Sequence, residues 1–164
     1  MSRSLFKELF DPIKHNGVTS MATKSEFLNE LYKDNGLVKD EDTYELSFGK
    51  RSVTIITRTG IEKIQYHNNI TVTFELESIN PLLEVGEGNS RNFSGGWVVV
   101  KATAKKGDVS VQSYGEASPQ NTQQKYPVAM AEKRALSRVV LKITGFYKYG
   151  VFGEDESDDF KQGK

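Results

Sequence analysis

Four cationic side chains lie close together between residues 126 and 145, in the stretch YPVAMAEKRALSRVVLKITG. Arg134, Arg138 and Lys142 follow one another at four-residue steps, and Lys133 lies beside them. At about 100° per residue, this spacing gathers the cations on one side of a helix. Like charges at this spacing repel each other, whereas a merely solvated face usually mixes signs. The pattern is therefore compatible with a solvated basic face or with a helix that holds an anion.

The same stretch also carries an apolar face and clear end signals. Pro127 suits the first turn of a helix, and Gly145 suits the position just after its end. The apolar residues form one sector that we expect to pack against the core; they are Val128, Ala129, Leu136, Val139, Val140 and Ile143. The apolar face is explained by packing alone, so any function must lie on the cationic side.

Strand patterns precede this helix. Ile70, Val72, Phe74 and Leu76 alternate with polar residues, which predicts a strand with one face in the core. Residues 97–114 predict a β-hairpin that turns at KKGD. Residues 44–60 read as a strand or strand pair that ends in a loop, and the Gly-, Asn- and Ser-rich residues 80–96 read as a loop.

Two shorter helices complete the predicted elements. Residues 25–36 read as a short amphipathic helix with Ser25 as its N-cap and Gly36 at its end. Residues 59–69 predict about two helical turns. The order of elements predicts an α+β fold, in which an antiparallel β-sheet with a β-β-β-α core carries the long basic amphipathic helix on one face.

The zero net charge of the 164-residue chain conceals a local asymmetry. Residues 97–150 carry nine Lys or Arg and three Asp or Glu, whereas residues 151–164 carry two and five. We expect one domain over residues 25–150, between a flexible N-terminal segment, residues 1–24, and an acidic C-terminal tail, residues 151–164. A local positive field of this kind attracts polyanions.

Composition excludes several classes of function. The chain has no cysteine, and its two histidines, His15 and His67, lie far apart, so thiolate catalysis is impossible and a zinc site is not expected. No Ser-His-Asp set, phosphate-binding loop or EF-hand pattern is recognisable. No apolar run is long enough for a membrane span or a signal peptide. We expect a cytoplasmic protein that is not an enzyme and needs neither metal nor cofactor.

Nucleic-acid phosphates are the expected polyanion, because arginine holds phosphate oxygens bidentately and each contact releases counterions. Lysines of the predicted hairpin extend the positive groove beyond the helix; they are Lys101, Lys105 and Lys106. Single strands would also stack on aromatic side chains, for which Trp97, Tyr114 and Tyr126 are candidates. Lys125, beside Tyr126, is expected to contact the same strand.

A strand and hairpin that begin WVVVKATAKKGDVSVQSYGEAS, a polar linker and a helix with AEKRALSR resemble the single-strand annealing proteins of the Rad-fifty-two superfamily, including compact phage recombinases. The resemblance covers roughly residues 53–145 and extends to RTGIEKI and YPVAMAEKRAL. It implies a β-β-β-α unit, assembly into rings or filaments, and single-stranded DNA held in a positive outer groove without ATP. If phage-encoded, the protein would act in the cytoplasm of a bacterial host.

The resemblance also assigns individual residues. Lys133 and Arg134 fall where the family's helix contacts backbone phosphates. The family's third cation falls at Ser137 in this chain, and the adjacent Arg138 is the candidate replacement, although a shift of one residue turns the side chain by about 100°. The expected function is therefore binding and annealing of single-stranded DNA in homologous recombination.

Three alternatives remain open at the level of sequence. The protein could protect single strands without pairing them. It could be an interaction or regulatory domain whose basic helix docks an acidic partner or its own tail. It could be a metal-dependent nuclease, the least favoured of the three. The acidic end, GEDESDDFK, reads either as a solvated tail or as a segment that recruits recombination or replication proteins.

Overall fold

The computed structural model describes residues 24–48, 51–80, 83–85, 92–94, 96–119, 121 and 126–157. Residues 1–23 and 158–164, and with them nearly all of the predicted N-terminal segment and half of the predicted acidic tail, lie outside this range, as does Lys125. The elements follow in the order α2 (Lys24–Asp34), β1 (Thr43–Phe48), β2 (Arg51–Ile56), α3 (Arg58–His67), β3 (Thr71–Asn80), β4 (Leu83–Val85), β5 (Asn92–Ser94), β6 (Trp97–Lys106), β7 (Val109–Ala117), α4 (Pro127–Thr144), η1 (Phe146–Tyr149), β8 (Val151–Gly153) and η2 (Glu154–Glu156).

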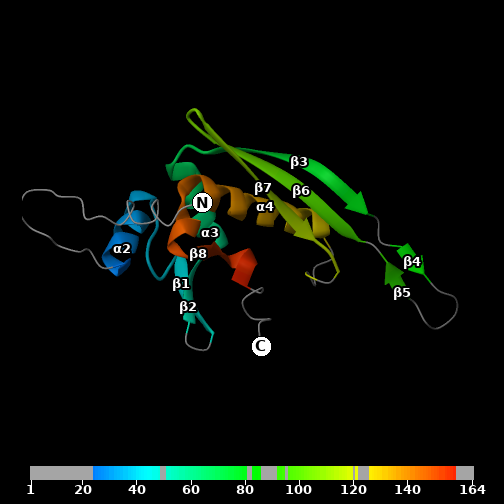
Figure 1. Ribbon diagram of the computed structural model, residues 1–164, viewed down its shortest axis with the longest axis horizontal. Coiled ribbons are helices and arrows are strands. Elements are labelled where there is room, and N and C mark those ends of the chain that lie inside the picture. The colour runs from blue at the N-terminus through cyan, green and yellow to red at the C-terminus, as the bar shows by residue number, and fades with distance from the viewer. Residues whose placement is uncertain are drawn as a thin grey trace, which may run out of the picture.

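The larger layer is an antiparallel sheet of three strands in the order β3-β6-β7, and α4 packs on one of its faces (Figure 1). A second sheet has the order β1-β2-β8 and contributes core residues on the other side of α4. The fold is therefore α+β, as predicted from the order of sequence patterns. The predicted long helix is present over 18 residues.

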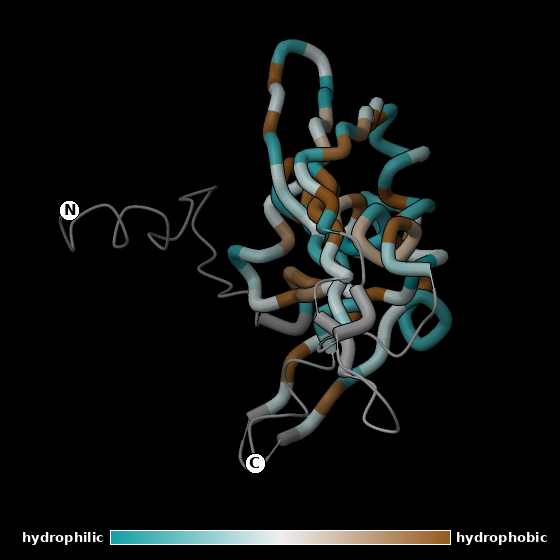
Figure 2. Tube along the Cα trace, turned by 90° about the vertical axis from the view of Figure 1, so that its right-hand side faces the viewer, coloured by the Kyte–Doolittle hydropathy of each residue, from teal (hydrophilic) through white to brown (hydrophobic). Residues whose placement is uncertain are grey.

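The β6–β7 hairpin forms where the sequence predicts it. Lys106 pairs with Val109, so Gly107 and Asp108 make a two-residue turn. Gly107 has a φ of +57°, a left-handed conformation that favours glycine. Figure 2 shows this turn projecting beyond the rest of the molecule, with hydrophilic residues at its tip.

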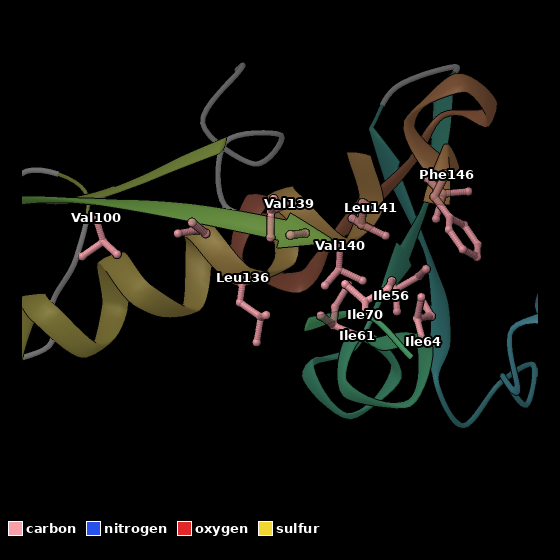
Figure 3. Packing of buried hydrophobic residues seen from close by; sticks show 14 of the residues in the cluster. Ile56, Ile61, Ile64, Ile70, Val100, Leu136, Val139, Val140, Leu141 and Phe146 are labelled. Atoms are coloured by element: carbon pink, nitrogen blue, oxygen red, sulfur yellow. The ribbon is translucent and has the colours of Figure 1, made fainter. Parts of the chain in front are cut away.

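Helix α4 also begins and ends as predicted. Pro127 is its first residue, and Gly145 ends it with a φ of +79°. Its core side chains meet residues from β2, α3 and the 3-10 helix η1 (Figure 3); the labelled members are Ile56, Ile61, Ile64, Ile70, Val100, Leu136, Val139, Val140, Leu141 and Phe146. The helix is therefore held from two sides, by the larger sheet and by residues of β2, α3 and η1.

The two shorter helices are present as α2 and α3. Gly36 follows α2 with a φ of +71°, in agreement with the predicted end. Ser25 lies inside α2 and not at its N-cap, because the helix already begins at Lys24. Thr57 caps α3, since its hydroxyl accepts a hydrogen bond from the Gly60 amide. Residues 44–60 are thus a strand pair followed by a helix start, not by a loop, and β4 and β5 occupy part of the loop predicted at 80–96.

The predicted boundary of the acidic tail at residue 151 needs correction. Val151 is fully buried, and β8 pairs in parallel with β2 through partners that include Thr54 and Val151. Ser157, at the end of the described part, is also buried. The acidic turn η2 therefore belongs to the folded domain, because the short apolar run VFG supplies a strand that composition alone conceals.

The predicted burial of β3 is also partly wrong. Ile70 and Val72 are in or beside the core, but Phe74 is 39% exposed and Leu76 is 58% exposed. Both face the side of the sheet that carries α4, since they pair with Ala102 and Val100, whose side chains are buried. Helix α4 packs on β6 and β7, so no described element covers the corresponding face of β3.

Candidate nucleic-acid interface

The three cations at four-residue steps along α4 all reach the outer edge of β7. Arg134 Nη1 donates to the Glu116 carbonyl at 2.5 Å. Arg138 Nη1 donates to the carbonyl of Tyr114 at 2.9 Å, and Lys142 Nζ donates to that of Gln112 at 2.8 Å. The cations thus bind every second carbonyl along the strand.

The match between helix and strand has a geometric cause. The pairings descend along β7 as they ascend along α4, so the two elements run antiparallel. Four helical residues rise about 6 Å, and two strand residues advance nearly 7 Å. Long cationic side chains absorb the small difference. The spacing that suggested a ligand therefore has a structural role, because the cations cover the carbonyls of an edge strand.

Burial decreases along this series. Arg134 is only 8% exposed, and it also donates to Asn121, through Nη1 to the side-chain oxygen at 2.9 Å and through Nη2 to the carbonyl at 2.6 Å. Arg138 is partly exposed, and Lys142 is exposed. Arg134 therefore fixes the connection between β7 and α4, and its guanidinium is committed to protein oxygens. Arg138 and Lys142 keep donors that face solvent.

Gly115 allows α4 to lie this close to β7. It is buried, and a Cβ at this position would overlap the Ala131 carbonyl oxygen and the Ala135 backbone nitrogen. Both α4 residues are alanines with no exposed surface. The first three residues of the GEAS stretch are thus part of strand β7 and pack against α4.

The position of the family's third cation is buried. Ser137 is 1% exposed, and its hydroxyl donates to the Lys133 carbonyl at 3.2 Å. A cation could not reach solvent from this side of the helix. Arg138, one position on, lies instead at the β7 edge beside Arg134 and Lys142. Lys133 is exposed, and its ammonium makes no hydrogen bond or ion pair with the described residues.

The acidic turn η2 contacts α4 from the side of Ser137. Glu156 lies 3.7 Å from Arg138 Nε, and its other oxygen accepts from the Tyr147 hydroxyl at 2.9 Å and the Gly153 amide at 3.1 Å. Asp155 is largely buried, and its Oδ2 has no hydrogen-bond partner among the described residues. Burial raises the pKa of Asp155 to about 6, although a hydrogen bond with Ser137 opposes this rise.

The hairpin lysines do not form one continuous site with the helix. Lys101 lies on the outer face of the sheet, 2.5 Å from Glu75 and 3.9 Å from Glu77. The hydrogen bond with Glu75 raises the pKa of Lys101. Lys106 donates to Asn68 after α3 at 2.6 Å, and Lys105 is exposed near the hairpin turn.

The candidate aromatic residues are all solvent-accessible. Tyr114 is half-exposed and lies opposite Lys101 in the β6–β7 ladder, so it borders both the β7 edge and the outer face of the sheet. Trp97 is exposed at the start of β6, and Tyr126 is exposed just before α4. The structure thus brings Tyr114, Arg138 and Lys142 together at one edge.

Two residues at the interface were missed in the sequence. Asn121 lies in a connection interpreted as a polar loop, yet its side chain binds both Arg134 and the Ser118 amide. No sequence pattern identifies it. Gly115 could have been recognised, because a glycine within a strand often marks a close backbone approach.

The described residues contain no group of His, Asp or Glu side chains that could hold a metal ion. Among the described helices, none combines the length and the apolar character needed to cross a bilayer. Neither a scan against models of protein families nor a search of curated proteins finds a match to this chain.

Proposed function

We propose that this protein binds single-stranded DNA along the outer edge of β7 and promotes its annealing without ATP. The observation that carries the proposal is the row formed by Arg138 and Lys142 beside Tyr114. Among the described residues, each of these two cations makes one hydrogen bond, to a carbonyl, and both side chains reach solvent; Arg138 also lies 3.7 Å from Glu156. The resemblance of this helix to the single-strand annealing proteins supports the same ligand.

In the proposed complex, backbone phosphates approach Arg138 and Lys142, and bases stack on Tyr114. Lys133, which is exposed on the same helix, extends the positive field. Arg134 acts differently from the expectation based on the family, since it positions the helix and does not contact DNA. Contacts with phosphates leave base edges available, which a protein needs if it is to pair two strands.

The test compares two double variants with equal changes in charge. Arg138→Gln with Lys142→Gln removes the proposed phosphate contacts, and Lys33→Gln with Lys39→Gln removes two exposed cations elsewhere. We expect the first variant to bind an unstructured oligonucleotide more weakly and to reduce the slope of log K against log salt by about 1.4, because each phosphate contact contributes about 0.7. The control variant should retain the slope.

Equal slopes for the first variant and the wild type would overturn the assignment to the β7 edge. A wild type that fails to bind single strands at low salt would overturn the function itself. Mixing complementary oligonucleotides then separates annealing from protection, because a protective protein binds both strands without accelerating their pairing.

One contact favours a second candidate, an interaction domain that binds acidic segments. Glu156 already lies beside Arg138, so a carboxylate can occupy the cationic edge. In this case an acidic peptide should bind the wild type, and the Arg138 and Lys142 variant should lose it. An oligonucleotide should then compete weakly or not at all.

A further inference from the structure

The outer edge of β3 is the second edge of the larger sheet, and its backbone groups lack a partner strand among the described residues. In antiparallel pairs, successive residues point their N–H and C=O groups alternately toward and away from the neighbouring strand. The outward carbonyls of Gln112, Tyr114 and Glu116 fix this alternation across the sheet. In β3 it directs the backbone groups of residues 72, 74 and 76 outward.

The side chains at these positions are apolar, and two of them are exposed. Phe74 and Leu76 are 39% and 58% exposed, and Ile79, beyond a bulge, is 58% exposed. By register all three lie on the face that carries α4. The same positions therefore offer backbone groups without a partner strand among the described residues and an exposed apolar surface adjacent to the core.

Of the two described edge strands of the larger sheet, β3 is the one at which another strand can be added. A strand that approached β7 would have to displace the cations that hold its carbonyls, starting with the buried Arg134. An exposed strand with apolar side chains on one face is a typical site of strand addition. The added strand needs apolar residues on the α4 side and residues on the other side that tolerate Glu75. The sequence of β3 itself, TVTFELESIN, meets this requirement.

Charge distinguishes two neighbouring registers for pairing two copies of β3. A two-fold axis at Glu75 would place the two Glu75 carboxylates opposite each other, which is unfavourable. An axis at Phe74 places Phe74 opposite itself, Val72 opposite Leu76, and Thr73 opposite Glu75. This register pairs apolar with apolar side chains on one face and leaves the ion pair between Glu75 and Lys101 intact.

We propose that two copies of the chain associate through antiparallel pairing of their β3 strands, centred on Phe74. The two three-stranded sheets then form one continuous sheet, with a β7 edge covered by α4 at each end. Because the pairing is two-fold, it closes as a dimer and does not by itself extend into a ring or filament.

The absence of native cysteine makes a direct test possible. Directly opposed residues with hydrogen-bonded backbones have Cα atoms about 5.5 Å apart, within the range for a disulfide. The single variant Phe74→Cys should therefore crosslink with its partner under mild oxidation, and the product should be visible on a non-reducing gel. Thr73→Cys, on the opposite face of the same strand, and Val109→Cys, exposed at the hairpin turn, are matched controls.

We expect crosslinking of Phe74→Cys at least tenfold faster than that of either control. Equal rates for the three variants, or no crosslink at position 74, would overturn the proposal. Sedimentation of the wild type and of Leu76→Lys, neither of which contains cysteine, gives an independent measure of the oligomeric state. The wild type should sediment as a dimer, and Leu76→Lys should sediment as a folded monomer with unchanged far-ultraviolet circular dichroism. A monomeric wild type, or an oligomer unaffected by Leu76→Lys, would contradict it.

Discussion

Both edges of the β3-β6-β7 sheet carry backbone groups that point away from the neighbouring strand, and the two edges differ in what lies against these groups. At β7, three cations of α4 bind the outward carbonyls, and Gly115 lets the helix approach. At β3, the outward backbone groups lie beside the exposed Phe74 and Leu76. The first edge is covered within one chain, whereas the second is suited to pairing with another strand.

In the sequence, cations that serve the fold look the same as cations that bind a ligand, and an accessible apolar strand looks the same as a core strand. The regular row of cations suggested a ligand site, yet its most buried member, Arg134, serves the fold. The alternating apolar residues of β3 suggested a core strand, yet part of that strand is accessible. In both cases the decisive factor is the position of α4, which covers β7 and β6 and stops short of β3.

Replacing Gly115 with valine should have the largest effect, because it opens the covered edge. The new side chain would overlap backbone atoms of Ala131 and Ala135, which cannot move independently of the helix. Overpacking usually costs 1–3 kcal/mol and sometimes more, so we expect a loss of about 3 kcal/mol or more in the free energy of unfolding. Urea denaturation measures this loss. A variant as stable as the wild type would show that α4 does not need its close approach to β7.

Substitutions of the cations by methionine should lower the free energy of unfolding by amounts that decrease along the same edge. Arg134→Met removes a buried guanidinium that donates to Glu116 and Asn121 and ties the β7–α4 connection to the helix, and we expect a loss of about 3 kcal/mol. Arg138→Met should cost about 1 kcal/mol, since its hydrogen bond is partly exposed. Thermal or urea unfolding of the two variants tests the order. Equal losses would contradict the decrease in burial from Arg134 to Arg138.

Much of the fold could be predicted because its signals are local. Pro127, Gly145 and the apolar period define α4, and the KKGD turn defines the hairpin. The pairing of β8 with β2 could not be predicted, because three residues, VFG, give too short a pattern and the partner strand lies far away in sequence. The acidic residues that follow concealed this strand further.

The candidate site was predictable in its residue types and not in its geometry. Four-residue spacing identified Arg134, Arg138 and Lys142 as a group, but whether such a row faces solvent or a strand edge depends on tertiary packing. Lys101 was expected in a groove with them, yet Glu75 and Glu77 lie beside it because β3 pairs with β6. Charge neutralisation by a neighbouring strand cannot be seen in a count along the chain.

Asp155→Asn tests how the acidic turn η2, which contacts α4, affects the stability of the helix that covers the β7 edge. The pKa of Asp155 is about 6 in the folded protein and near 3.8 without the fold, so the native state binds the extra proton between these values. The free energy of unfolding should therefore fall as pH rises from about 4 to about 6. A shift of about two pH units corresponds to at most about 3 kcal/mol, and we expect roughly half of this because the turn lies near the surface.

The asparagine variant should accordingly be more stable than the wild type at pH 7 and nearly equal to it at pH 4. Urea denaturation at both pH values provides the comparison. Glu154→Gln, at an exposed position in the same turn, is the control for the removal of one negative charge. A stabilisation that is equal at pH 4 and pH 7 would exclude titration of Asp155 as its cause.

Leu76→Thr should have the smallest effect on the fold, because it lies at the open edge. Its side chain is largely exposed within one chain, and threonine is well accepted in strands. At protein concentrations low enough for monomers, we expect the free energy of unfolding to change by less than about 0.5 kcal/mol. Leu136→Ala, on the buried face of α4, should cost about 2 kcal/mol or more. If the two leucine substitutions lower the free energy of unfolding equally in dilute protein, β3 is covered within the single chain. The two edges of the sheet would then no longer differ.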